Sequence, residues 1–339
     1  MNVHRTGPAH LARRRLMTVI TATLAAAAVT LVGCGSDDDG GQAGGTSLQQ
    51  ALSRVSATDA TVTYIEFGDA ERIREASGGS FKGVWGSLDG WGSSTLAQYR
   101  RQVPEVLGID PEAAQMYLTV GQPPETVTLL QGGQDAEAIT SASTASGWTG
   151  EDTLTLEMDP TQPISISSPH IRPLADDVVV GGTAADLGVV DADGEDTTLA
   201  GAPVVGELAD CLGDVFAAYF IDSEAYPTAL GVRPAEDDPE SPVSIMCVLT
   251  PSVSDAERLA EEIPSTVAEG DMPSQGRPYA IMFEAAEAEI LDGEHVVRVE
   301  LEHTDGALAN VIFQMVFKRD LPVVSLGDPA AELSDDDTP

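Results

Sequence analysis

Lysine, cysteine and histidine are scarce in this 339-residue chain. Lysine occurs only at positions 82 and 318, and acidic side chains outnumber lysine plus arginine by 55 to 17. A surface with this excess of negative charge repels phosphate backbones, so the composition argues against a nucleic-acid partner. The cysteines are Cys34, Cys211 and Cys247. Their spacing provides no C-x-x-C redox motif.

Recognised catalytic motifs are also missing from the chain. It contains no G-x-S-x-G, S-x-x-K, Walker or G-x-G-x-x-G sequence, which leaves the usual serine-hydrolase, β-lactamase and nucleotide-binding interpretations without their motif. Beyond the N-terminal segment the histidines are His170, His295 and His303. The last two lie roughly 26 Å apart if they share one straight strand, too far to bind one zinc ion. We predict neither a metal site nor a cofactor.

One acidic stretch is a candidate calcium ligand set. The run Asp191-Ala192-Asp193-Gly194-Glu195-Asp196 places oxygen ligands at alternate positions. Its glycine comes at the fourth position instead of the sixth, and no glutamate stands at the twelfth, so it is not an EF-hand. A turn explains the same residues without an ion, and the sequence leaves calcium binding open.

Long apolar runs are absent after Thr46, but one is present before it. The stretch from Leu16 to Val32 follows Arg13, Arg14 and Arg15 and runs into Cys34. A basic segment, an apolar segment and small residues at the end are typical of a secretory signal peptide. The alternatives are an ordinary cleaved signal peptide or an uncleaved membrane anchor.

The end of this segment, Leu31-Val32-Gly33-Cys34, resembles the lipobox of bacterial lipoproteins. The resemblance implies that Cys34 receives a thioether-linked diacylglyceryl group and becomes the first residue of the mature chain. Such an anchor holds a protein on the extracytoplasmic face of the cell membrane. Loss of residues 1–33 removes four arginines and no acids, which leaves 13 basic and 55 acidic side chains.

Composition divides the remainder of the chain. Residues 34–47 are small, polar and acidic, and we predict a flexible linker. Residues 331–339 form an acidic tail, which we predict to be disordered. The length between them favours two domains, and we place these at residues 48–165 and 166–330, with the boundary in a proline-containing stretch.

A recurring local pattern indicates the fold class. Three times an apolar, β-rich stretch leads into Asp-Ala-Glu and then a helical pattern, at Asp69, Asp135 and Asp255. Aspartate at a helix start accepts hydrogen bonds from free N–H groups, and Ser254 with Glu257 has capping-box spacing. The predicted helices and strands follow a similar order in the two halves of the chain. This similarity favours two weakly similar α+β domains, each a mainly antiparallel sheet with helices on one face. Common capping chemistry explains the short motif equally well.

Three further elements complete the expected fold. Residues 286–291 and 294–301 flank Asp292-Gly293, a strong turn signal, and predict a hairpin. Residues 310–317 are rich in β-formers and predict a last strand. Residues 96–107 predict an amphipathic helix.

The paired cysteines indicate a cross-link. Cys211 and Cys247 are the two that remain after Cys34 in an exported chain, and we predict that they form a structural disulfide.

Two tryptophans are weak candidates for ligand binding. Trp85 and Trp91 lie in the glycine- and serine-rich residues 78–92. Exposed indoles on such a loop suit a contact with a ligand or partner. The alternative, which we favour, is that both rings fold back and anchor the loop.

These observations favour a non-catalytic binding or assembly role at the bacterial cell envelope. The partner would be an envelope protein or a small molecule held between the domains. One alternative is an envelope hydrolase that uses paired carboxylates from Glu66, Asp69 or Glu300, since carboxylate catalysis leaves little sequence signature. The other is a solute-binding lipoprotein of a transporter.

Overall fold

A computed structural model describes residues 45–191, 197–223, 225–291, 293 and 295–323. The lipobox with Cys34, most of the predicted linker and the predicted tail lie outside these residues. The first helix, α1 (Ser47–Leu52), begins one residue before the predicted start of the first domain, because the Thr46 and Gln49 side chains form a capping box there.

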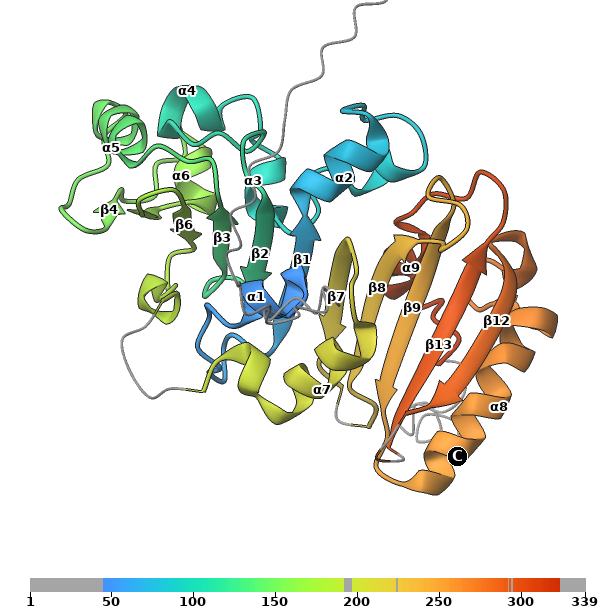
Figure 1. Ribbon diagram of the computed structural model, residues 1–339. Helices are drawn as coiled ribbons and strands as arrows, with labels where there is room; N and C mark the ends of the chain where they lie inside the picture. The colour runs from blue at the N-terminus through green and yellow to red at the C-terminus, as the bar shows by residue number, and fades with distance from the viewer. Residues whose placement is uncertain (1–44, 192–196, 224, 292, 294, 324–339) are drawn as a thin grey trace, which may run out of the picture. The chain divides into compact units, whose positions relative to one another are not determined.

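One antiparallel sheet of eleven strands organises the described chain (Figure 1). In spatial order the strands are β12 (Phe283–Ile290), β13 (Val296–His303), β9 (Pro242–Leu249), β8 (Thr228–Pro234), β7 (Ala217–Ile221), β1 (Tyr64–Asp69), β2 (Met116–Val120), β3 (Val127–Gln131), β6 (Val178–Gly181), β5 (His170–Pro173) and β4 (Leu154–Thr155). A separate hairpin pairs β10 (Asp271–Met272) with β11 (Arg277–Pro278). The expected α+β class with a mainly antiparallel sheet is confirmed.

The strands of the two predicted domains join in this one sheet. β1 pairs with β7, with Glu66 directly opposite Tyr219. β5 and β6, which a boundary at residue 166 assigns to the second domain, pair in the first half of the sheet, where β6 lies beside β3. The predicted boundary therefore does not match the strand pairing, and the division into two domains stays a prediction.

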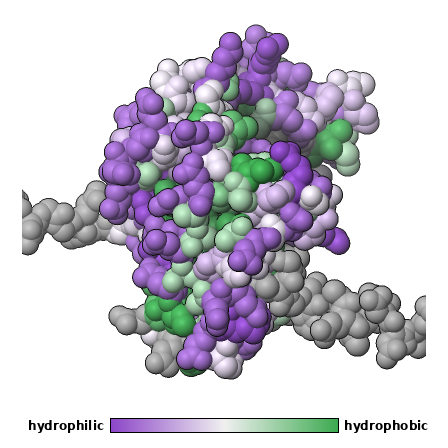
Figure 2. Space-filling view, turned by 90° about the vertical axis from the view of Figure 1, so that its right-hand side faces the viewer, coloured by the Kyte–Doolittle hydropathy of each residue, from purple (hydrophilic) through white to green (hydrophobic). Residues whose placement is uncertain are grey.

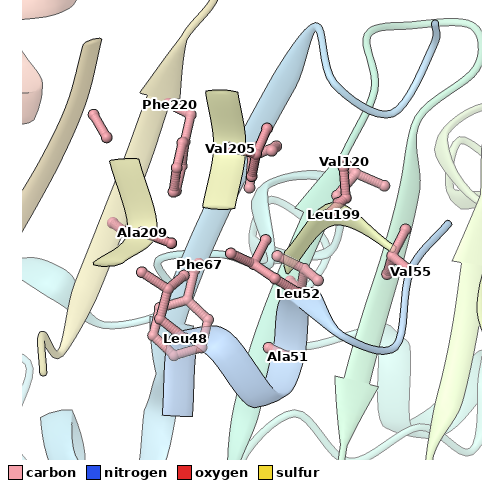
Figure 3. Close-up of a cluster of buried hydrophobic side chains, with 14 of the residues drawn as sticks. Leu48, Ala51, Leu52, Val55, Phe67, Val120, Leu199, Val205, Ala209 and Phe220 are labelled. Atoms are coloured by element: carbon pink, nitrogen blue, oxygen red, sulfur yellow. The ribbon is translucent and has the colours of Figure 1, made fainter. Parts of the chain in front are cut away.

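Helices cover both faces of the sheet, so the expectation of helices on one face is wrong. On one face lie α1 and α7 (Pro203–Leu212). Their apolar side chains pack on Phe67 and Phe220 (Figure 3). Alternate strand residues point the other way and pack on α5 (Ala136–Ala145), α8 (Val253–Glu269) and α9 (Val311–Lys318). The strands carry apolar side chains on both faces of the sheet. Each face must therefore be covered by helices to keep these side chains out of water.

The remaining helices are short. They are α2 (Ala70–Ser77), α3 (Ser94–Ala97), α4 (Val103–Leu107) and α6 (Ile164–Ser167), with 3₁₀ turns at Trp85–Leu88, Leu187–Val189, Leu199–Gly201 and Tyr279–Ile281. Asp69 and Asp135 cap α2 and α5 as predicted. At α8 the capping side chain is Ser252, two residues before the predicted Ser254.

Two other predictions are corrected. Residues 311–318 form α9 instead of a strand, and residues 96–107 include the end of α3 and all of α4, with a turn between them. Pro104 occupies the first turn of α4, where a missing N–H costs nothing and a new helix starts easily.

The side of the molecule that carries β12 and α8 is largely hydrophilic, with a smaller apolar area between the polar residues (Figure 2). β12 is one edge of the sheet, and Glu284, Glu287 and Glu289 on it are exposed. Charged side chains on an edge strand hinder pairing with a second chain.

Candidate functional site

The structure contains an open cleft of about 660 Å³. We call it the arginine cleft; it is lined by Phe81, Arg100, Arg101, Pro104, Gly108, Ile109, Asp110, Pro111 and Glu112. These residues come from the loop after α2, the turn between α3 and α4, α4 itself, and the segment after α4. The cleft lies within the first half of the sequence, whereas we expected a ligand site between two domains.

Local sequence explains why the cleft is open. α2 ends at Gly78, whose φ of 61° lies in the left-handed region that glycine adopts without strain. The chain leaves the helix there and carries Phe81 outward, with 62% of its surface exposed. α4 ends in the same way at Gly108, with φ of 69°. Gly108 and Phe81, which follows Gly78 by three residues, both line the cleft.

A smaller recess of about 140 Å³ adjoins the cleft. Arg100 and Pro111 line both cavities, and the recess also reaches Asp89, Leu96 and Tyr117. Burial raises the pKa of Tyr117 to about 12, so its phenol stays protonated at neutral pH. Its hydroxyl donates to the carbonyl oxygen of Pro111 and fixes the floor of the recess.

Arg100 connects the walls of the arginine cleft. Its guanidinium pairs with Asp89 and lies 3.8 Å from a carboxylate oxygen of Glu112. Its Cζ atom is 4.5 Å from the centre of the Phe81 ring, a cation–π distance. Burial lowers the pKa of Arg100, but the charge and hydrogen bond of Asp89 more than compensate and raise it. The side chain therefore stays cationic and holds the loop with Phe81 against the segment with Glu112.

Trp85 and Trp91 fold back toward the protein. Trp85 is 3% exposed, and its indole nitrogen donates to the carbonyl of Pro239 at 3.2 Å. Trp91 stacks on Phe313 with ring centres 4.2 Å apart and donates to the carbonyl of Ala218. Both rings thus anchor residues 78–92 to the second half of the chain. The exposed aromatic residue of this loop is Phe81, which the sequence interpretation overlooked in favour of the tryptophans.

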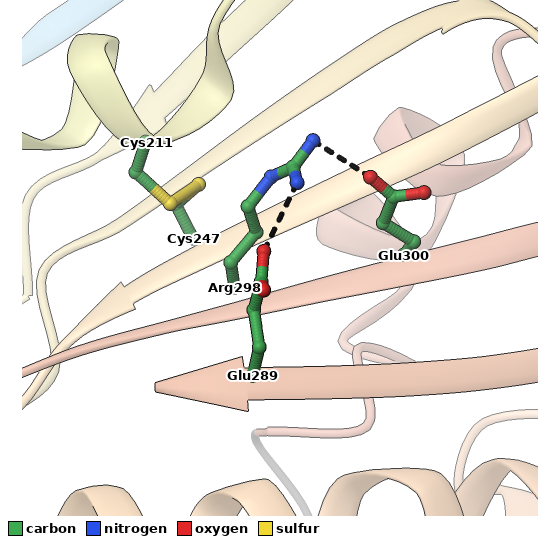
Figure 4. Close-up of a disulfide and its surroundings, with 5 residues drawn as sticks. All are labelled: Cys211, Cys247, Glu289, Arg298 and Glu300. Atoms are coloured by element: carbon green, nitrogen blue, oxygen red, sulfur yellow. Dashed lines mark hydrogen bonds and ion pairs between the residues drawn. A yellow bond between two sulfur atoms is a disulfide. The ribbon is translucent and has the colours of Figure 1, made fainter. Parts of the chain in front are cut away.

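The three candidate carboxylates do not form a pair. Glu66 and Asp69 point to opposite faces of β1, and Asp69 caps α2. Glu300 lies four strands away from Glu66, roughly 19 Å at ordinary strand spacing. Arg298 binds Glu300 and Glu289 (Figure 4), and Arg233 binds Glu300 as well.

Glu66 is nevertheless an unusual carboxylate. It is 5% exposed, accepts the Tyr64 hydroxyl at 2.6 Å and the Gly92 N–H at 3.0 Å, and burial raises its pKa. Its hydrogen bonds hold the loop of residues 78–92 against β1. We interpret Glu66 as a structural link, because both of its carboxylate oxygens are buried and hydrogen-bonded.

The histidines are also separate. His303 is 9% exposed, and its Nε2 lies 2.7 Å from the buried Ser244 hydroxyl. Burial lowers the pKa of His303 to about 4. A serine beside a histidine is the arrangement of an activated nucleophile, but Ser244 is fully buried and out of reach of a substrate. His170 lies on β5, near the opposite end of the sheet.

Cys211 and Cys247 form a disulfide with Cα atoms 6.1 Å apart, as predicted. It joins α7 to β9, and Arg298 is the residue opposite Cys247 on β13 (Figure 4). Asp191, the first residue of the calcium candidate, binds Arg54, which lowers the pKa of Asp191. The rest of that candidate, residues 192–196, lies outside the described residues. Among the described residues, no group of three or more His, Cys, Asp or Glu side chains is placed to hold a metal ion.

Comparison with known proteins adds no relative: no family model, no curated protein and no solved structure matches the chain. Within residues 45–323, gaps excluded, no helix has the length and apolar character needed to cross a bilayer. The arginine cleft is the candidate binding site among the described residues.

Proposed function

We propose that this protein is a lipid-anchored, extracytoplasmic binding protein of the bacterial cell envelope, with a non-catalytic role. The observation that carries the binding role is the arginine cleft, whose volume of about 660 Å³ falls in the range of small-molecule sites. Its lining combines an exposed aromatic ring with two guanidinium groups, which suits recognition of a ligand with apolar and polar parts.

The location rests on the resemblance of residues 31–34 to a lipobox. The disulfide between Cys211 and Cys247 supports an oxidising compartment, since such bonds are rare where thiols are kept reduced. An anchor on Cys34 would keep the cleft near the membrane, where a ligand or an envelope partner is met.

The arrangement of acids favours binding over hydrolysis. Carboxylate catalysis needs two acids within about 10 Å of each other across a substrate. Glu66, Asp69 and Glu300 do not converge on a common cavity in the described structure. The transporter alternative gains no support either, because every pairing in the sheet is antiparallel and such proteins usually show repeated parallel β-α units.

Native mass spectrometry of the mature protein, released from its own membrane with mild detergent, tests the proposal. We expect a diacylglyceryl-modified N-terminus at Cys34 and a retained molecule that is lost from Phe81→Ala. Val204→Ala is the matched control, because Val204 is an exposed apolar residue on α7, outside the cleft. A retained molecule that is unaffected by Phe81→Ala would place binding elsewhere. A protein that retains no bound molecule would count against small-molecule binding. A second protein bound in a fixed ratio would indicate an assembly role instead.

A further inference from the structure

The recess beside the arginine cleft has the size of a small ring. Its volume is about 140 Å³, and a cavity of about 150 Å³ with an apolar lining is large enough to hold benzene. Arg100 and Pro111 line both the recess and the cleft. The two spaces are therefore neighbours, and one ligand can lie in the cleft and extend a group into the recess.

The hydroxyl groups that line the recess already donate within the protein. The Ser93 hydroxyl donates to the carbonyl oxygen of Gly90 at 2.7 Å, and the Tyr117 hydroxyl donates to the carbonyl oxygen of Pro111. A polar group of a ligand that entered the recess would give up its hydrogen bonds to water without an equal exchange. The recess therefore favours an apolar group.

The charged side chains of the cleft and the recess favour neither sign of charge in a ligand. The cations are Arg100 and Arg101, and the acids are Asp89, Asp110 and Glu112. Asp89 and Arg100 already pair with each other. An anionic group would meet three carboxylates, and a cationic group would meet two guanidinium groups. An uncharged ligand avoids both repulsions.

The rest of the recess is apolar and fixed by the fold. Leu96, Ala97 and Pro111 line it, and Leu96 is 1% exposed. An apolar group that fills this space gains about 25 cal/mol for each Å² of apolar surface removed from water. Ser93 and Tyr117 are buried, so the walls that they provide need little ordering when a ligand binds.

We propose that the recess is the specificity pocket of the arginine cleft and receives an uncharged apolar group about the size of a benzene ring. The remainder of the ligand lies in the cleft, against the exposed ring of Phe81. The ligand is thus an uncharged molecule with one small ring or branched apolar group at its end. This inference rests on the proposed binding function and specifies its ligand.

Methyl NMR of the mature chain carrying Cys34→Ser, titrated with toluene, benzylamine and benzoate, tests the ligand class. The three probes share one ring and differ in charge. We expect toluene to shift the methyl signals of Leu96 and Ala97 and to show NOEs to both. We also expect toluene to bind about tenfold more tightly than either charged probe.

Ala97→Phe places a ring in the recess and should weaken toluene binding about tenfold. Ala97 is exposed, so the larger side chain displaces no core residue. Ala145→Phe is the matched control, because Ala145 is exposed at the end of α5 and lines neither cavity. Methyl signals from the second half of the chain, unchanged in both variants, show that the fold is kept.

Each other outcome overturns the inference. Benzylamine or benzoate that binds as tightly as toluene would show that the recess does not select against charge. Toluene NOEs confined to methyl groups outside the recess, or toluene binding that Ala97→Phe leaves unchanged, would place the apolar group elsewhere. If none of the probes binds, the recess is not a pocket for such a group.

The molecule retained on the native protein separates failure of this inference from failure of the proposed function. Loss of that molecule from both Phe81→Ala and Ala97→Phe supports the recess as part of the binding site. Loss from Phe81→Ala alone would leave the cleft as a binding site and contradict the role of the recess.

Discussion

The guanidinium of Arg100 lies 4.5 Å from the centre of the Phe81 ring, and the same guanidinium pairs with Asp89. A single side chain thus fixes the exposed ring of one loop relative to the segment that carries Glu112. The cleft between them is shaped by the fold before any ligand arrives. This relationship supports a binding role, because preorganised sites lose less entropy on binding.

Gly92→Ala should destabilise the fold more than Gly83→Ala. The two glycines have nearly equal φ angles, 86° and 87°, so the backbone cost of alanine is similar. A Cβ at position 92 would meet the Gly68 nitrogen at 2.7 Å and Tyr117 at 2.9 Å, whereas position 83 is open. We expect a difference of about 1–3 kcal/mol in the free energy of unfolding. Equal values in urea titrations would show that the loop does not pack tightly on β1 and β2.

His303 should make the protein less stable below neutral pH. Burial lowers its folded-state pKa from 6.5 to about 4, so the unfolded chain binds a proton first as the pH falls. The stabilisation is complete above pH 6.5 and is lost between pH 6.5 and 4, by up to about 3 kcal/mol. Urea titrations of wild type and His303→Gln at pH 7 and pH 4.5 measure it. The variant should show the smaller difference between the two pH values, and identical differences would contradict the buried neutral imidazole.

Loss of the disulfide should reduce stability without changing the fold. Cys211 and Cys247 are 36 residues apart, and closing such a loop restricts the unfolded chain. The chain-entropy model gives about 3–4 kcal/mol for this restriction. Guanidinium titrations of wild type and the double variant Cys211→Ala, Cys247→Ala should differ by that amount. Reductant should bring wild type close to the variant and leave the variant unchanged. A reductant-insensitive wild type would mean that the cysteines are not joined in the protein.

Replacement of Cys34 should release the protein from the membrane. If the lipobox resemblance is correct, Cys34→Ser lacks the thiol that carries the diacylglyceryl group. The variant then has no acyl chains to hold it to the bilayer. Membrane fractionation should find wild type in the detergent-soluble membrane fraction. Retention of Cys34→Ser in the membrane would indicate an uncleaved anchor.

Sequence patterns identified the elements whose signals are local. Asp69 and Asp135 mark helix starts because their carboxylates bond N–H groups two or three residues along the chain. The hairpin of β12 and β13 follows from strong turn chemistry, and Gly293 has φ of 108°. The disulfide follows from the cysteine count. None of these inferences needs knowledge of distant neighbours.

The errors come from tertiary packing. Val311, Ile312 and Phe313 favour a strand intrinsically, but in α9 they are buried against the second half of the sheet, and burial outweighs propensity. The joining of both halves through β1 and β7 depends on edge-to-edge pairing, which alternation along one strand does not reveal. The arginine cleft combines residues 81–112 from three segments. The one local signal for it was a large apolar residue, Phe81, in a glycine- and serine-rich loop.

The central claim is that the protein meets its ligand at the arginine cleft. The most direct test replaces Phe81 by the photo-crosslinker p-benzoylphenylalanine in cells that make the lipidated protein, with the same replacement at Val204 as the control. After irradiation, mass spectrometry of the purified protein should find one defined small-molecule adduct at position 81 and none at position 204. The same adducts at both positions, or an adduct at position 204 alone, would contradict the account.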